Sequence, residues 1–251
     1  MSLIPSLYKR LVPNPGELRA GTFVKTNAIQ QIEILGLTPL HFVVIDAEHA
    51  PFDRGDIDAM AFAGRAVGLP VIVRIPDHSP ATILSVLDSG AAGLLVPHVD
   101  SVQDAQHVVV RVRCRGGERG FSSSTRAAGY GTLAMPEALN ALDGVLVVAQ
   151  IESQAGVQAA AGIAAVDGIG GLFVGRADLA ISMNEPNQKS PAVLSATQQT
   201  LKAALDVQKI AGMAVGNVVE RDEFSKWGAN WFVIGSDQSL LRQAATAIAI
   251  A

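Results

Sequence analysis

The sequence predicts a closed (β/α)8 barrel, and three observations support this. Short apolar segments that read as strands recur along the chain, at 21–24, 42–45, 71–75, 93–96, 145–151, 172–174, 213–218 and 231–234. A helical pattern follows each of them, and eight β/α units in about 250 residues fit the size of such a barrel. The segments are also continuous apolar runs, as in a parallel sheet that is covered on both faces. An open doubly wound sheet is the alternative, but no glycine-rich dinucleotide fingerprint follows the first strand.

Helices are expected between these strands and at both ends of the chain. Their predicted ranges are 5–12, 28–35, 56–67, 80–89, 102–112, 154–163, 191–211, 220–226 and 237–250. The segment 113–135 is rich in Gly, Ser and Arg and is expected to be a loop, which at this length is usually functional or disordered. No linker divides the chain, so we expect a single domain over 1–251.

The last predicted helix should also contact a second subunit. Its apolar residues occupy more than one face, which indicates burial against a partner as well as the barrel. They are Leu240, Leu241, Ala244, Ile248 and Ile250.

Composition excludes several classes of protein. Of the 251 residues, 49% are hydrophobic and 17% charged, which suits a globular α/β domain rather than a disordered chain. The net charge of −4 and the absence of a basic stripe argue against nucleic acid and membrane surfaces as partners. No apolar run approaches the roughly 20 residues of a membrane span, and the N-terminus lacks a secretion signal. With Cys114 as the single cysteine, we expect a reducing compartment and a cytoplasmic protein.

Polar residues follow five of the predicted strands. In chain order they are Asp46-Ala47-Glu48-His49, Arg74, Pro97-His98, Gln150-Ile151-Glu152 and Gly175-Arg176-Ala177-Asp178. A barrel brings the carboxyl ends of its strands to one rim, where active sites lie. Singly, each residue has an ordinary structural explanation; Asp178, for example, could be the N-cap of a helix that begins at Leu179. Together on one rim, they indicate a site.

The residue types on this rim point to metal-assisted chemistry. Glu152, at a buried strand end, and Asp178 would repel each other unless a cation relieves them, which predicts a magnesium or manganese site. A 2-keto acid can chelate such an ion, which then acidifies the carbon next to the keto group. Arg74 can donate to the enolate oxygen, and His49 can move a proton. A metal ion, an arginine and a histidine in this arrangement are suited to forming or breaking a carbon–carbon bond next to a carbonyl group.

Six segments resemble the HpcH/HpaI aldolases, over roughly residues 18–240. They are HFVVIDAEHAP (41–51), VIVRIP (71–76), LDSGAAGLLVPHV (87–99), RGFSSSTRAAGYG (119–131), AQIES (149–153) and GLFVGRADLAISM (171–183). The resemblance implies a class II pyruvate aldolase with Mg²⁺, Mn²⁺ or Co²⁺ as cofactor. Such an enzyme reversibly cleaves 4-hydroxy-2-keto acids to an aldehyde and pyruvate, or a close analogue such as hydroxypyruvate, through a metal-bound enolate. It also implies a homohexamer, a trimer of dimers, in which the last helix is exchanged between subunits.

The resemblance assigns a role to each matching residue. Glu152 and Asp178 bind the metal and Arg74 stabilises the enolate. His49 is the acid/base, assisted by Asp88, which reaches the site of a neighbouring subunit. The remaining positions contact substrate: Gln150 lines the pocket, and the backbone at Ala177 and Asp178 holds the pyruvate carboxylate.

The chain departs from the family pattern at three places. Phe23 stands where the family usually has Trp, Asn27-Ala28 replaces a Ser-Pro, and Arg176 replaces the Pro of a common Gly-Pro. An arginine at the mouth could attract an acidic acceptor aldehyde or point into an interface.

Three other functions remain as alternatives. A Schiff-base aldolase would use Lys25, but nothing nearby in the sequence lowers the pKa of that amine, and a solvated loop residue is expected there instead. A citramalyl- or malyl-CoA-type lyase would normally be a longer chain. The third alternative is a barrel that binds a keto acid without catalysis.

Overall fold

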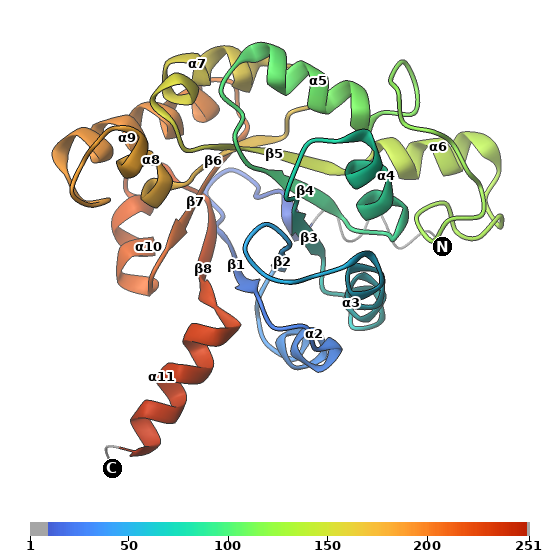
Figure 1. Ribbon diagram of the computed structural model, residues 1–251, viewed down its shortest axis with the longest axis horizontal. Helices are drawn as coiled ribbons and strands as arrows, with labels where there is room; N and C mark the ends of the chain where they lie inside the picture. The colour runs from blue at the N-terminus through green and yellow to red at the C-terminus, as the bar shows by residue number, and fades with distance from the viewer. Residues whose placement is uncertain (1–9, 250–251) are drawn as a thin grey trace.

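Eight parallel strands pair in sequence order and close into a barrel, which confirms the predicted fold class (Figure 1). The computed structural model describes residues 10–249. The strands are β1 (Arg19–Val24), β2 (Phe42–Asp46), β3 (Val71–Arg74), β4 (Gly93–Val96), β5 (Leu146–Ile151), β6 (Gly171–Val174), β7 (Ile210–Val215) and β8 (Trp231–Ser236). The helices are α2 (Ile29–Gly36), α3 (Arg54–Ala66), α4 (Pro80–Asp88), α5 (Val102–Val112), α6 (Met135–Asp143), α7 (Gln154–Ala165), α8 (Arg176–Ser182), α9 (Pro191–Asp206), α10 (Val218–Ser225) and α11 (Asp237–Ala249).

Two helices lie outside the helix ranges predicted from the sequence. α6 follows the irregular segment 113–134; Pro136 lies in its first turn and the Glu137 side chain accepts a hydrogen bond from Ala134 N–H. α8 begins at Arg176, so Asp178 lies within its first turn. The idea that Asp178 caps a helix beginning at Leu179 is therefore wrong.

The boundary between α9 and β7 also differs from the prediction. The helix expected over 191–211 ends at Asp206, because Gln208 takes a left-handed backbone conformation with φ of 57°. β7 therefore begins at Ile210, three residues before the predicted start. Asn217, predicted to lie in the strand, instead caps α10 by accepting hydrogen bonds from Val219 and Glu220 N–H.

The barrel interior is filled by side chains that alternate along the strands. We call this buried cluster the inner core; its members are Leu11, Phe42, Val44, Ile72, Leu95, Leu146, Val148, Phe173, Ile210, Trp231 and Val233. The rings of Phe42 and Trp231 stack at 4.0 Å, and Phe173 meets Trp231 edge-on at 6.0 Å. The residues between them face outward and pack against the helices in a larger outer core.

The chain ahead of β1 closes the amino-terminal end of the barrel. Leu11 is fully buried in the inner core, and its carbonyl accepts a hydrogen bond from Trp231 Nε1 at 3.1 Å. Arg10 donates to the carbonyls of Leu40 and Gly68, in the loops that lead into β2 and β3. The predicted helix at 5–12 lies mostly outside the described residues. Because the amino-terminal end is closed, the open carboxyl end of the barrel, which we call the mouth, is the end that can hold an active site.

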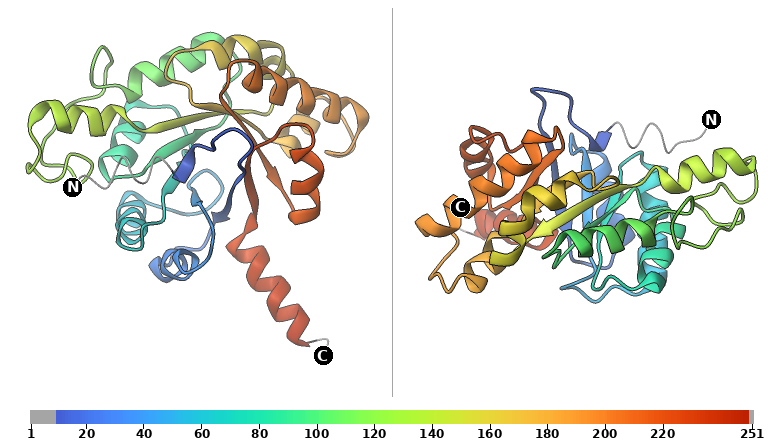
Figure 2. Two further views of the ribbon diagram at one scale, coloured as in Figure 1. Left: turned by 180° about the vertical axis from the view of Figure 1, so that it is seen from behind. Right: turned by 90° about the horizontal axis from the view of Figure 1, so that it is seen from above.

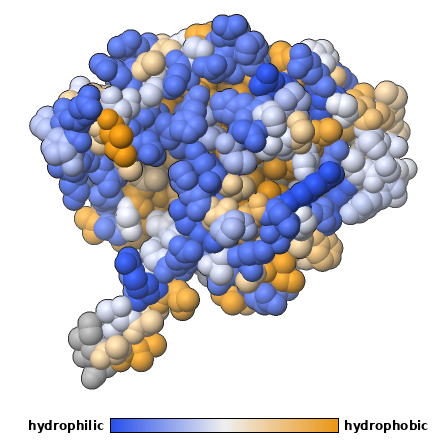
Figure 3. All heavy atoms as spheres, viewed as in Figure 1, coloured by the Kyte–Doolittle hydropathy of each residue, from blue (hydrophilic) through white to orange (hydrophobic). Residues whose placement is uncertain are grey.

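The last helix, α11, projects away from the barrel (Figures 1 and 2). Its first residue, Asp237, is buried and accepts hydrogen bonds from the backbone N–H groups of Lys25 and Thr26 beyond β1. Residues 240–249 are all exposed, and hydrophobic surface lies along the helix (Figure 3). Within residues 10–249, no helix is both long enough and apolar enough to span a membrane.

Candidate active site

The predicted site residues continue the inward-facing rows of their strands. Inner-core residues are followed two positions later by polar ones: Val44 by Asp46, Ile72 by Arg74, and Val148 by Gln150 and then Glu152. Side chains two positions apart on a strand point to the same face. The polar residues therefore also point into the barrel, and they lie above the inner core at the carboxyl ends of the strands. The strand period therefore places them around one mouth.

A buried ion pair between Asp46 and Arg74 lies at the centre of this mouth. Arg74 donates from Nε to Asp46 Oδ1 at 2.9 Å and from Nη2 to Oδ2 at 2.7 Å, a bidentate arrangement. Lys25 Nζ lies 2.8 Å from Asp46 Oδ2. Burial by itself would raise the pKa of Asp46, but the hydrogen bonds from Arg74 and Lys25 outweigh it and lower that pKa to about 2. Asp46 therefore stays ionised and fixes the plane of the guanidinium.

Glu48 extends the network from Arg74 to two histidines. Its Oε2 lies 3.3 Å from Arg74 Nε and 3.7 Å from His49 Nε2, and its Oε1 lies 3.2 Å from His98 Nε2. His49 is anchored from the other side, because its backbone N–H donates to Asp46 Oδ1 at 3.1 Å. The His49 ring itself is 55% exposed, so it is accessible at the mouth.

Glu152 forms the other end of the same network. His98 approaches Glu152 Oε1 through its backbone N–H at 2.7 Å and through Nδ1 at 3.0 Å. Gln150 Nε2 donates to Glu152 Oε2. An unbroken series of contacts thus runs from Lys25 through Asp46, Arg74, Glu48, His98 and Glu152 to Gln150.

Three members of this network had no role in the sequence analysis. Glu48 and His98 were recognised only as strand-end residues, and Lys25 was expected to be solvated. That expectation is wrong, because Lys25 pairs with a buried carboxylate. The alternation of side chains along a strand could have predicted the position of Lys25. Phe23 packs against the inner core, and Lys25, two residues later, points to the same side.

Other predicted residues lie near this network without a contact to it. Ala177 and Asp178 are exposed in the first turn of α8. The backbone N–H groups of 176–178 precede the first bond within that helix, from Leu179 N–H to Gly175 O, so they have no intrahelical partner. Gly175 brings this turn close to Glu152, since a Cβ there would lie 3.0 Å from Glu152 Oε2.

Asp88 and Arg176 point elsewhere within the chain. Asp88 ends α4, which runs antiparallel to the strands, so it lies toward the amino-terminal side of the barrel; it accepts a hydrogen bond from Arg119 at 2.9 Å. Arg176 is 3% exposed, pairs with Glu220 at 3.2 Å and lies over the Phe224 ring. Within one chain Arg176 therefore points neither to an acceptor nor to an interface, which corrects both suggestions.

The oxygen atoms at this end of the barrel fit a hard divalent cation. Glu48 Oε2 and Gln150 Oε1 are buried without a hydrogen-bond partner, and the first turn of α8 comes close to Glu152 at Gly175. Oxygen ligands are those that Mg²⁺ and Mn²⁺ prefer. No three His, Cys, Asp or Glu side chains within 10–249 are placed to hold a metal together.

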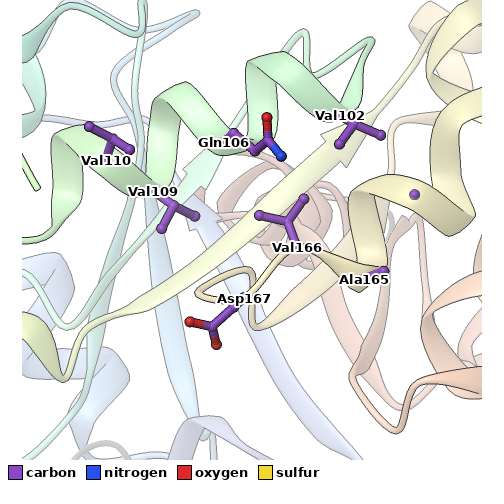
Figure 4. A pocket seen from close by; sticks show the side chains of 8 residues that line it. Val102, Gln106, Val109, Val110, Ala165, Val166 and Asp167 are labelled. Atoms are coloured by element: carbon purple, nitrogen blue, oxygen red, sulfur yellow. The ribbon is translucent and has the colours of Figure 1, made fainter. Parts of the chain in front are cut away.

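A separate hollow of about 470 Å³ lies on the outer surface between α5 and α7 (Figure 4). Valine and alanine side chains line most of it, among them Val102, Val109 and Val166. It contains none of the predicted site residues, so the mouth of the barrel remains the candidate active site.

Comparison with known proteins agrees with this architecture. Residues 19–244 match the family model described as HpcH/HpaI aldolase/citrate lyase. The chain belongs to this family. A 5-keto-4-deoxy-D-glucarate aldolase from Escherichia coli is 33% identical over 219 residues, covering 86% of this chain and 85% of that protein.

Solved structures share the fold over nearly the whole chain. A HpcH/HpaI aldolase/citrate lyase family protein from Burkholderia cenocepacia superposes with a TM-score of 0.89 at 30% identity, over 97% of both chains. A HpcH/HpaI aldolase from Desulfitobacterium hafniense has a TM-score of 0.87 at 23% identity, over 94% of this chain and 92% of that one, a likeness that concerns the fold alone.

The Asp46 ion pair gives a prediction about stability and pH. Asp46→Asn leaves Arg74 and Lys25 without their buried counter-charge, and breaking such a pair costs about 3–5 kcal/mol. Because the folded-state pKa of Asp46 is depressed from 3.8 to about 2, its stabilisation is present above pH 4 and is lost as the pH falls toward 2. Urea unfolding of wild type and variant should therefore differ most near pH 7 and converge in acid.

Asp206→Asn is the matched control, since Asp206 pairs with Lys202 on the surface of α9 with 58% of its side chain exposed. It should change the free energy of unfolding by less than about 1 kcal/mol. An Asp46→Asn protein as stable as this control at pH 7 would contradict the structural role of the ion pair.

Proposed function

We propose that this protein is a divalent-metal-dependent aldolase that reversibly cleaves 4-hydroxy-2-keto acids to an aldehyde and pyruvate, or a close analogue such as hydroxypyruvate. The observation that carries this proposal is the continuous network from Arg74 to Glu152 at the mouth of the barrel. The name of the E. coli relative, an aldolase, supports it. The cytoplasmic location expected from the sequence stays a prediction.

Glu152 and Asp178 would hold the metal ion. Glu152 is 4% exposed and Asp178 is exposed, so one ligand is fixed by its surroundings while the other is free to adjust. When bound, a divalent ion acts as a Lewis acid toward the keto oxygen and makes the neighbouring carbon more acidic. Gln150, with its buried Oε1 unpaired, lines the same space.

Arg74 would stabilise the enolate that cleavage generates. Nε and one N–H of Nη2 are used by Asp46, while Nη1 has no hydrogen-bond partner among residues 10–249. The guanidinium is therefore held rigidly and still has donors to offer. A fixed donor directed at an oxygen where negative charge develops lowers the barrier without reorganisation.

His49 would take the proton from the 4-hydroxyl group as the carbon–carbon bond breaks. Its backbone is fixed by Asp46 and its ring is exposed at the mouth. Asp88 would assist from a neighbouring subunit, because it lies on the other side of the barrel from His49 within its own chain. The free N–H groups of Ala177 and Asp178 would receive the carboxylate of the keto acid.

A Schiff-base mechanism through Lys25 fits the contacts less well. A nucleophilic lysine must be an uncharged amine with a free lone pair. Lys25 Nζ instead lies 2.8 Å from the buried carboxylate of Asp46, so it is held in an ion pair and is not free to attack a carbonyl group.

Metal removal tests the proposed class of aldolase. A chelator should abolish cleavage of a panel of 4-hydroxy-2-keto acids, and Mg²⁺, Mn²⁺ or Co²⁺ should restore it. Glu152→Ala and Asp178→Ala should each lose activity, whereas Asp206→Ala, which removes an exposed carboxylate, should not. Full activity in chelator, or borohydride trapping of pyruvate on Lys25, would point to the Schiff-base alternative.

Arg74 gives a second kinetic prediction. Arg74→Ala should lower kcat for cleavage by at least about 100-fold, the usual cost of removing one oxyanion donor. Arg74→Lys should recover little of the lost kcat, because an ammonium group cannot reproduce the planar arrangement of donors in the guanidinium. Arg221→Ala, on α10, controls for the loss of a positive charge away from the mouth. Near-normal kcat in Arg74→Ala would show that the arginine serves structure alone.

We further propose that the protein is a homo-oligomer, a hexamer built of dimers, with α11 exchanged or buried between subunits. Leu241 and Ile248 are 68% and 80% exposed on a helix that projects from the barrel, which leaves an apolar surface for a second copy to cover (Figure 3). In this assembly Asp88 would reach a partner's site. Ile250, also named for this contact, lies outside the described residues.

Light scattering at micromolar concentration should find an oligomer, and Leu241→Arg with Ile248→Arg should reduce its size. Leu37→Arg, at an 88% exposed position on the barrel, is the control and should leave the assembly intact. A wild-type monomer would contradict both the assembly and the proposed use of Asp88 between subunits.

A further inference from the structure

His98 occupies an unusual backbone conformation directly after β4. Its φ is +53°, in the left-handed region that residues other than glycine seldom enter. Such a conformation persists where surrounding contacts enforce it, and it is often found at functional sites. Here it turns the backbone N–H of His98 toward Glu152 Oε1, at 2.7 Å.

The His98 ring bridges two carboxylates that come from distant parts of the barrel. Nδ1 lies 3.0 Å from Glu152 Oε1, after β5, and Nε2 lies 3.2 Å from Glu48 Oε1, after β2. The two carboxylate side chains are 3% and 10% exposed, whereas the ring is 66% exposed. The ring therefore links two nearly buried acids from the solvent side of the mouth.

These contacts fix the orientation of Glu152. Oε1 receives the backbone N–H of His98 and faces Nδ1 of its ring, and Oε2 receives Gln150. A neutral imidazole carries one N–H, so in either tautomer the ring can donate to one of the two carboxylates. Residues that orient a metal ligand by hydrogen bonding to it typically change metal affinity by about 10–100-fold when they are removed.

We propose that His98 is a positioning residue that holds Glu152 in the orientation in which it binds the divalent ion. This inference rests on the proposed function, since it requires Glu152 to be a metal ligand. His98 acts through Glu152, so its loss weakens metal binding before any substrate is present. The contact with Glu152, through Nδ1, is the important one, and the contact with Glu48 supports the ring.

The test is direct titration of the whole protein with Mn²⁺, without substrate, following the electron paramagnetic resonance signal of free Mn²⁺. His98→Ala should weaken Mn²⁺ binding by about 10–100-fold. His98→Asn should restore most of the affinity, because its amide nitrogen takes the place of Nδ1 and Asn tolerates the left-handed backbone. His98→Gln, whose amide lies nearer the place of Nε2, should remain weak. His107→Ala, at an exposed position on α5, is the control.

Each outcome separates this inference from the metal site itself. If wild type binds Mn²⁺ and Glu152→Ala does not, the site stands; normal affinity in His98→Ala would then overturn the role of His98 alone. Equal affinities in His98→Asn and His98→Gln would overturn the role of Nδ1. No Mn²⁺ binding by wild type would overturn both proposals. Should His98→Ala not fold, as judged by circular dichroism, the comparison of His98→Asn with His98→Gln carries the same test.

Discussion

The ion pair between Asp46 and Arg74 is the constraint on which the mouth of the barrel depends. A fully buried carboxylate is costly unless it is paired, and here a bidentate guanidinium and a lysine surround it. Because apolar residues of similar size often stabilise a protein as well as such a pair does, its presence at the rim favours a functional explanation. The pair fixes Arg74, and the position of Arg74 sets where Glu48 and then His98 can lie.

The layers beneath the site make this arrangement possible. The stacked rings of Phe42 and Trp231 and the buried Leu11 fill the barrel from its amino-terminal end. Water therefore reaches the polar network only from the carboxyl end, where electrostatic interactions are strengthened by the apolar floor. Gly175 lets the start of α8 come close to Glu152, because it has no side chain between the two.

Much of the fold could be predicted from sequence because its signals are local. Continuous apolar runs identified the eight strands, and the common position of their carboxyl ends in a barrel placed Asp46, Arg74 and Glu152 on one rim. The errors in the helix boundaries arose where a single residue changes the backbone direction without a strong sequence signal. Gln208 is an example, since its left-handed backbone conformation ends α9. α6 was not predicted because the segment before it was read as a long polar loop. Pro136 and Glu137, which are typical of a helix start, were therefore not recognised.

The network itself could be predicted only in part, because its contacts join strands that are far apart in the chain. His98 reaches Glu48 and Glu152 only because its backbone leaves the extended conformation, which no local pattern reveals. The pairing of Lys25 with Asp46 likewise follows from the barrel and not from its neighbours in sequence. Asp88 and Arg176 show the same limit. Neither the family resemblance at Asp88 nor the departure from the family pattern at Arg176 tells which way a side chain points within one subunit.

We propose that Asp46 holds Arg74 in the orientation in which it stabilises an enolate. The most direct measurement is the exchange of pyruvate methyl protons with deuterium, followed by proton NMR in D₂O with Mg²⁺, for wild type and Asp46→Asn. This reaction needs no aldehyde, so it reports the enolate step whatever the natural substrate. Wild type should show metal-dependent exchange, and a folded Asp46→Asn protein that still binds the metal should exchange about 100-fold more slowly. Exchange at the wild-type rate in that variant would show that Asp46 does not position Arg74 for the enolate step.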